Sequence, residues 1–538
     1  MFLFILLAAT PADLVVTNAK IHSLAAEARP GGPRATALAV KEGRIIYVGD
    51  DKGAAAYEAK DKIDAGGKTI VPGLIDAHAH LRSLGGEMEI LDLHGCKSAG
   101  EIVTRVQAAL PKIQKGQWLE GRGWDQNDWT DKRFPSHETL SAATPNNPVI
   151  LRRVDGHAAL LNAVALKAAG IDDKTKDPAG GRIGRDERGA ATGILLDDAL
   201  ELVTKVMPKR TKEDLERQIL AAQEKAIAVG LTGMHDMGTT KDELAVLRIL
   251  RRKNLLKLRV YVALDGSDDA LTTEEYARGK AIDPMLTVRA VKLYADGALG
   301  SRGASLLKPY SDDPKNGGLR ITNDAALLAA AQKAKAAGFQ VCVHAIGDAA
   351  VRATLDVFAK VAKADDRYRV EHAQVVDAAD WPRFQKLEVI ASMQPTHATS
   401  DMDWAEARLG HERVAGAYAW RSLMKAGARL AFGSDFPVEH PDPLFGLYAA
   451  ITRTDHAQKP AGGWRVQEAM TPTEALRGFT LDAAYAGFSE GELGTLEIGK
   501  RADFVVLSVD PLGAKPQELL RAKIVATVVG GKRVYGAL

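Results

Sequence analysis

The chain has 538 residues, 46% of them hydrophobic and 26% charged, with a formal net charge of +2. This length exceeds what one simple core accommodates, so two or three domains are expected. The composition is that of a globular protein, and the near-neutral charge gives no indication of binding to nucleic acid or to an anionic membrane. With only two cysteines, a disulfide framework is excluded.

The chain begins with an apolar run, residues 2–9, followed by Thr10-Pro11-Ala12. This pattern is typical of a secretory signal with a small-residue cleavage site near Ala12, although no lysine or arginine precedes the run. The run is too short to span a bilayer. Residues 1–12 are therefore interpreted as a signal peptide, and the mature protein as periplasmic or secreted. The alternative is a cytoplasmic protein with an incorrect start site, or with a first strand packed on its body.

Both ends of the chain have the pattern of short strands joined by tight turns. Near the start, Lys41-Glu42-Gly43 separates two strand-like runs, and near the end Gly530-Gly531 does the same. This shared pattern predicts one small β-sandwich built from residues 13–70 and 490–538.

In the middle of the chain, strand-like and helix-like runs alternate. Counting the run before His78, eight strand-like runs are found: residues 69–75, 231–236, 258–264, 287–295, 339–345, 368–373, 389–394 and 428–434. Eight strands with helices between most of them predict an α/β fold, a (β/α)8 TIM-like barrel over residues 71–84 and 211–489. Residues 85–210 exceed what one strand-to-helix connection requires. They are interpreted as an insertion domain after strand one, at the active-site face.

Side chains able to bind metal lie at the ends of several predicted barrel strands. His78 and His80 are two residues apart, so both project in one direction from the first strand. Further candidates lie on the fourth, fifth, sixth and eighth strands: Lys292, His344, His372 and Asp435. The C-terminal ends of barrel strands converge on one face, and imidazole and carboxylate groups bind divalent transition metals. Each residue alone has an ordinary structural explanation, but the whole set predicts a metal site.

This ligand pattern resembles that of the amidohydrolase superfamily, and the resemblance covers nearly the whole chain, including the split sandwich. Several phrases are similar to those of the amidohydrolase-3 subgroup, which includes N-substituted formamide deformylases: Gly123-Trp124-Asp125, Asp155-Gly156-His157, Asp296-Gly297-Ala298-Leu299-Gly300-Ser301-Arg302, His344-Ala345-Ile346-Gly347-Asp348, Glu371-His372-Ala373 and Gly433-Ser434-Asp435-Phe436-Pro437.

The resemblance implies a metal-dependent hydrolase that cleaves a C–N amide-type bond in a small N-acyl or N-formyl compound through a metal-activated hydroxide. It implies a homodimer and two Zn²⁺ per chain, although Mn²⁺, Co²⁺ or Fe²⁺ would suit the same ligands. Asp435 would also be the catalytic general base. The implied ligands are His78, His80 and Asp435 for the first metal, His344 and His372 for the second, and a carboxylated Lys292 as the bridge.

Four further residues are candidates for substrate binding: Trp124, His157, Arg302 and His397. Trp124 could equally belong to the core of the insertion, and Arg302 could brace its own loop. Two rival functions stay open. One is deamination of an amino-substituted ring; Lys292 argues against it, because many deaminases of the superfamily lack the bridging lysine. The other is a non-catalytic scaffold, which the complete ligand set disfavours.

Overall fold

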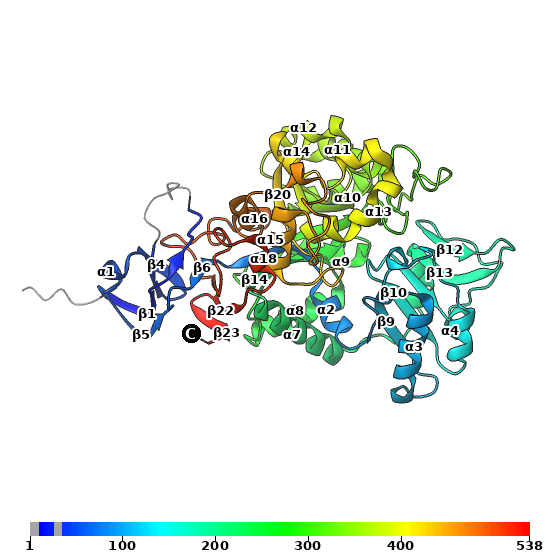
Figure 1. Ribbon diagram of the computed structural model, residues 1–538, viewed down its shortest axis with the longest axis horizontal. Helices are drawn as coiled ribbons and strands as arrows, with labels where there is room; N and C mark the ends of the chain where they lie inside the picture. The colour runs from blue at the N-terminus through cyan, green and yellow to red at the C-terminus, as the bar shows by residue number, and fades with distance from the viewer. Residues whose placement is uncertain (1–9, 26–34, 538) are drawn as a thin grey trace, which may run out of the picture.

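The computed structural model describes residues 10–25 and 35–537. Three units follow one another along its long axis: a β-sandwich built from the first and last described segments, a central barrel and an insertion domain on the far side of the barrel (Figure 1). The predicted fold class is confirmed in all three parts. Within the described ranges, none of the helices has both the length and the apolar character needed to cross a membrane.

The sandwich combines a four-stranded sheet, order β4-β3-β1-β5, with a five-stranded sheet, order β2-β6-β21-β22-β23. Apolar side chains of the two sheets, among them Val16, Val40 and Phe504, share one buried core. Its strands are β1 (Thr10–Thr17), β2 (Lys20–Ile21), β3 (Ala37–Lys41), β4 (Arg44–Gly49), β5 (Tyr57–Asp64), β6 (Thr69–Pro72), β21 (Phe504–Leu507), β22 (Ile524–Val529) and β23 (Lys532–Gly536), with helix α1 (Asp51–Ala54) before β5.

The first strand begins inside the segment interpreted as a signal peptide. Thr10 and Ala12 are part of β1 and pair in parallel with Tyr57 and Ala59 of β5. Cleavage at Ala12 would remove the start of this paired strand. The rest of the expected signal, residues 1–9, lies outside the described residues.

The barrel strands are all parallel, in the order β20-β19-β18-β17-β16-β15-β14-β7. Backbone hydrogen bonds connect its two ends, because Asp435 N–H donates to the His78 carbonyl at 2.7 Å and His80 N–H to the Phe436 carbonyl at 2.9 Å. The strands are β7 (Leu74–Ala79), β14 (Leu231–Thr239), β15 (Arg259–Asp265), β16 (Leu286–Tyr294), β17 (Gln340–Ala345), β18 (Arg369–His372), β19 (Ile390–Met393) and β20 (Arg429–Phe432).

Helices surround these strands and cover their outer face (Figure 1). They are α2 (Leu81–Glu87), α7 (Lys212–Ala228), α8 (Lys241–Arg252), α9 (Asp269–Arg278), α10 (Asp324–Ala336), α11 (Asp348–Val361), α12 (Trp381–Lys386), α13 (Pro395–Arg413), α14 (Trp420–Lys425), α15 (Pro443–Thr452), α16 (Pro472–Gly478), α17 (Leu481–Ala486) and α18 (Pro516–Leu519). Residues of β7, β17 and β18 are buried throughout, which explains why these strands are apolar runs rather than alternating patterns.

The predicted first strand is divided in two by Gly73. The part before it, β6, pairs with β21 in the sandwich, and the part after it, β7, is the first barrel strand. A Cβ atom at Gly73 would lie 2.2 Å from the Thr232 hydroxyl. Only glycine therefore allows the chain to pass from one unit to the other at this point.

The insertion is built on a six-stranded sheet, order β12-β13-β11-β10-β9-β8. Apolar clusters on this sheet form its own core, so it is more than a long loop. Its elements are β8 (Leu91–Asp92), α3 (Ala99–Ala109), β9 (Leu119–Trp124), α4 (Glu138–Ala143), β10 (Val149–Arg153), β11 (Ala158–Leu161), α5 (Ala163–Ala168), β12 (Gly181–Arg185), β13 (Ala191–Asp197) and α6 (Glu201–Thr204).

Candidate metal centre

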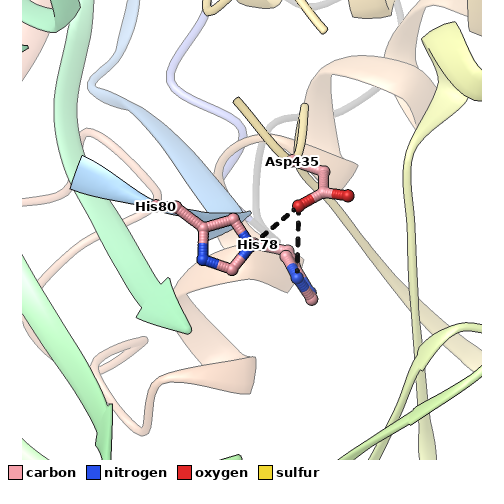
Figure 2. A group of neighbouring side chains, drawn as sticks. All are labelled: His78, His80 and Asp435. Carbon is pink, nitrogen blue, oxygen red and sulfur yellow. Dashed lines mark ion pairs between the residues drawn. The ribbon is translucent and has the colours of Figure 1, made fainter. Parts of the chain in front are cut away.

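Three of the expected ligands meet at the seam between the first and eighth strands. His78 lies within β7, His80 directly follows it, and Asp435 lies in the turn after β20. Asp435 Oδ1 lies 3.0 Å from His80 Nε2 and 3.5 Å from His78 Nε2 (Figure 2). The three possible ligand atoms all lie within 4.8 Å of one another, which is close enough to share one ion.

A second group shares Asp435 with the first. It consists of His372, His397 and Asp435, again with ligand atoms within 4.8 Å. His397, expected only as a substrate contact, thus lies beside the metal ligands, with Nε2 at 3.7 Å from Asp435 Oδ2. His344 is adjacent, its ring 4.6 Å from that of His372, but its Nε2 faces the Gly297 carbonyl at 3.4 Å.

The backbone at two of these residues adopts the left-handed conformation. The φ angle is +71° at His372 and +61° at Asp435, a region that non-glycine residues rarely occupy. Buried Asp76 fixes the turn that carries Asp435, because it accepts hydrogen bonds from the Ser434 hydroxyl at 2.6 Å and from His78 N–H at 3.0 Å. A Cβ at Gly433 would lie 2.4 Å from Asp76 Oδ1. These contacts fix the turn that carries Asp435 against the strand that carries His78.

Lys292 is buried in β16 with 1% of its surface exposed. Its Nζ lies 3.1 Å from His78 Nε2. Burial lowers the pKa of Lys292 to about 8, while Glu371 and Asp435 act in the opposite direction. A larger fraction of this amine is therefore neutral near pH 7 than for an exposed lysine.

Three imidazoles of the barrel, those of His78, His344 and His372, are held in the neutral form. Burial and the nearby Lys292 lower the pKa of His78 to about 4, and burial lowers the pKa values of His344 and His372 well below the usual range. Neutral imidazole is the form that binds a metal. Burial would raise the pKa of Asp435, but the imidazoles around it hold that pKa well below its usual range.

Glu371 orients His78 from behind. Its Oε2 lies 2.6 Å from His78 Nδ1, and its Oε1 lies 2.7 Å from Nε of fully buried Arg369. Burial would raise the pKa of Glu371, but Arg369 and His78 lower it below the usual range. Because the carboxylate accepts a hydrogen bond from Nδ1–H, the proton of His78 stays on Nδ1 and the Nε2 lone pair is free to bind a metal.

The residues present fit a divalent metal. Asp435 Oδ1 and His397 Nε2 are buried, and neither has a hydrogen-bond partner of good geometry among the described residues. Burying such a polar group without a partner costs free energy and destabilises the folded chain. An ion held by the neutral imidazoles and the ionised carboxylate would supply one for Asp435, and this donor set suits a divalent transition metal.

A cavity of about 1020 Å³ opens above these ligands, between the barrel and the insertion domain. The barrel wall contributes Lys292, His344, His372 and Asp435, and the insertion wall contributes Arg153 and His157 among others. A cavity of this size admits a small molecule.

His157 reaches the cavity from the insertion, as expected of a substrate contact, with its ring 5.2 Å from that of His344. Its Nδ1 donates to Asp197 Oδ1 at 2.7 Å. Burial would lower the pKa of His157, but Asp197, Asp155 and Asp435 raise it to about 9. This imidazole is therefore cationic at neutral pH, unlike those of the barrel.

Asp197 was not among the sequence candidates, yet it connects the insertion to the barrel. A Cβ at Gly297 would lie 2.7 Å from its Oδ1, and a Cβ at Gly303 would lie 2.9 Å from its Oδ2. Both glycines belong to the loop that follows the strand of Lys292. No sequence signal singles out Asp197, because it lies 40 residues from His157.

Two substrate-binding candidates do not line the cavity as the structure describes it. Trp124 is fully buried in the insertion core, where its indole N–H donates to the Leu151 carbonyl at 2.8 Å. Arg302 donates to Asp312 at 2.9 Å and braces its own loop. For both residues the structure shows the alternative that the sequence had left open.

A parallel barrel with buried His and Asp groups at the C-terminal ends of its strands is the arrangement of a metal-dependent barrel enzyme. The model of the Amidohydrolase family matches residues 61–535, and the chain belongs to this family. It is a metal-dependent amidohydrolase, a hydrolase that acts on carbon–nitrogen bonds.

Three similar proteins extend this result. Protein LONG AFTER FAR-RED 3 of Arabidopsis thaliana is 35% identical, covering 97% of this chain and 92% of that protein. N-substituted formamide deformylase of Arthrobacter pascens is 28% identical, covering 97% and 98%. The crystal structure of an uncharacterized metal-dependent hydrolase from Pyrococcus horikoshii OT3 is 30% identical, with a TM-score of 0.75, covering 94% of this chain and 99% of that one.

Proposed function

We propose that this amidohydrolase hydrolyses the amide-type bond of small N-acyl or N-formyl compounds, using two divalent metals, with zinc as the expected ion. The observation that carries the proposal is Lys292, which is buried in the barrel beside His78. In addition to burial, its charge lowers the pKa values of His344 and His372, so Lys292 acts on the expected ligands of both metals. The relation to an N-substituted formamide deformylase over nearly the whole chain supports the substrate class.

Lys292 would act as a carboxylated bridge. The ammonium group would first lose one proton to become a neutral amine. The amine would then attack the carbon of CO₂: a C–N bond forms, one C=O π bond opens onto oxygen and a second proton leaves to solvent, so that the cation becomes an anionic carbamate. Burial favours this reaction, because it lowers the pKa of the amine. His78, His80 and Asp435 would hold one metal, and His344 and His372 the other.

Divalent metals at these ligands would make water nucleophilic at neutral pH and polarise the scissile carbonyl. Asp435 is ionised and lies at the centre of both ligand groups, so it accepts the proton of the attacking water. It then returns the proton to the leaving amine. His157, cationic on the opposite wall, would bind an electron-rich group of the substrate.

The test combines metal content with product analysis. Purified full-length protein should contain about two metals per chain and release a carboxylic acid and an amine in equal amounts from N-formyl or N-acyl compounds. One metal, an unmodified Lys292 and ammonia released from an amino-substituted ring would instead indicate the deaminase. Neither metal nor turnover after reconstitution would indicate a scaffold. Export and homodimer formation stay predictions, which N-terminal sequencing and light scattering would check.

A further inference from the structure

His397 is the imidazole of the centre whose role the metal ligands leave unexplained. It lies in the first turn of α13, directly after the seventh barrel strand, and its side chain is 7% exposed. Its ring stacks on that of His372, with centroids 6.1 Å apart and an interplanar angle of 15°. Its Nε2 points to Asp435 Oδ2 at 3.7 Å and has no hydrogen-bond partner among the described residues. A buried polar atom aimed into the cavity requires a ligand.

The partner of each Nδ1 atom decides what Nε2 can do. For His78, Nδ1 faces a Glu371 oxygen at 2.6 Å, and for His372 it faces the Gln394 amide oxygen at 2.9 Å. Oxygen accepts, so the proton lies on Nδ1 and the Nε2 lone pair is free for a metal. For His397, Nδ1 faces the amide nitrogen of Gln374 at 3.0 Å. Nitrogen donates, so Nδ1 is the acceptor and the proton lies on Nε2.

Buried contacts hold the Gln374 amide in this orientation. Its Oε1 lies 3.4 Å from the Tyr418 hydroxyl, and Tyr418 N–H donates to the Gln374 carbonyl at 2.7 Å. The Tyr418 hydroxyl is in turn hydrogen-bonded to the Asp401 carboxyl group. The tyrosine hydroxyl donates to this carboxyl group, and burial raises the pKa of Asp401 well above its usual range. Buried contacts on both Tyr418 and Gln374 therefore support the amide that faces His397.

We infer that His397 is a catalytic hydrogen-bond donor to the acyl oxygen of the substrate rather than a metal ligand, and that Gln374 is the positioning residue that fixes its tautomer. The inference rests on the proposed function, which supplies an acyl oxygen that gains negative charge in the transition state. A preorganised donor aimed at such an oxygen stabilises the transition state more than the ground state.

The first experiment compares His397→Ala and His397→Gln with the wild type, using zinc. We expect His397→Ala to keep two metals and an unchanged zinc affinity, measured by competition with a chelator. Its kcat should fall about 10²–10³-fold, the usual effect of losing one such donor, with little change in KM. His397→Gln, whose amide can donate, should recover part of this loss. The matched control is His411→Ala, because His411 lies just beyond the interruption of α13 at Gly410, with its side chain 94% exposed.

The second experiment tests Gln374 with a double-mutant cycle. Gln374→Met keeps the size of the side chain but removes the amide. We expect kcat to fall about 10-fold, the effect of losing one hydrogen bond between uncharged groups. The double variant with His397→Ala should be no slower than His397→Ala alone, because Gln374 acts through His397. Independent losses that multiply would overturn the positioning role.

Other outcomes distinguish a failure of the role assigned to His397 from a failure of the proposed function. Loss of one metal, or zinc binding more than tenfold weaker in His397→Ala, would show that His397 is a ligand and overturn the inference. A kcat within threefold of the wild type would overturn the donor role. If the wild type itself binds two metals but turns over no N-acyl or N-formyl compound, the proposed function fails, while the zinc measurement still decides whether His397 is a ligand.

Discussion

The two walls of the cavity use the same side chain in opposite ways. On the barrel wall, His78, His344 and His372 are neutral because burial lowers their pKa values, and neutral rings bind metal. On the insertion wall, burial acts on His157 as well, but the carboxylate of Asp197 overcomes it and raises the pKa to about 9. A carboxylate partner alone does not decide the charge, because His78 also faces one, Glu371, at 2.6 Å, and burial together with Lys292 still keeps it neutral. The balance of burial and all neighbouring charges therefore decides whether a histidine stays neutral or carries a charge.

The two walls also differ in the task they suit: the barrel wall suits the chemical step and the insertion wall suits substrate recognition. The barrel wall is made of strand ends whose positions the backbone hydrogen bonds fix, which suits reactive groups that need defined geometry. The insertion wall is a separate folded unit with its own core. We expect changes on the barrel wall to lower kcat or metal content, and changes on the insertion wall to alter substrate affinity and its pH dependence.

The largest effect is expected for Asp435→Asn, because it removes the general base while leaving an oxygen that can still face the metal. Turnover should fall about 10²–10⁴-fold with much of the metal retained. Steady-state kinetics and elemental analysis on the same sample would check this. Turnover close to that of the wild type would exclude Asp435 as the base.

Lys292→Ala should remove the bridge and with it at least one metal. The loss of activity should exceed the ~100-fold that removal of a group behind a ligand can cause. Elemental analysis is the measurement, and Arg289→Ala, on the same strand but facing Phe488 outside the cavity, is the control. Two full equivalents of metal in Lys292→Ala would refute the bridging role.

Glu371→Gln tests how the barrel wall keeps His78 in the form that binds metal. The amide is a weaker acceptor for the Nδ1 proton and leaves Arg369 without its carboxylate. Zinc affinity should fall about 10–100-fold. A chelator competition assay measures this, and an unchanged affinity would mean that Glu371 serves the fold alone.

Asp197→Asn should have the smallest effect on turnover and the clearest effect of pH. The His157 ring lies beside that of neutral His344, and the carboxylates of Asp197, Asp155 and Asp435 raise its pKa. Without the Asp197 charge, the imidazolium loses its proton at lower pH, so the basic limb of kcat/KM should move to lower pH. We expect KM at pH 8 to rise about tenfold with a smaller change in kcat.

Asp197→Asn should also change stability in a way that depends on pH, with a sign set by the raised pKa of His157. The pKa of His157 is raised on folding, so its contribution is complete below about pH 6.5 and is lost as the pH rises through about 9. The wild type should therefore exceed Asp197→Asn in unfolding free energy by on the order of 2 kcal/mol at pH 6, and by much less at pH 9.5. Urea unfolding at both values would show this, and a pH-independent difference would contradict it.

Much of the barrel wall could be predicted from the sequence because its order is local and periodic. A strand places residues i and i+2 on one side, and parallel strands end on one face. His78 and His80 could therefore be assigned a direction, and His344, His372 and Asp435 a common location, before any contact was known. The terminal sandwich followed in the same way, from hairpin patterns at both ends of the chain.

Only the tertiary structure decided what each side chain contacts. Glu371 lies 293 residues from His78, and Gln374 and Asp197 each meet their histidine across separate elements. Trp124 turned away from the cavity into a core, and Gly73 divided one apolar run between two units. Periodicity is a property of neighbours along the chain, whereas tautomer, charge and access depend on partners that only the folded chain brings within a few ångströms.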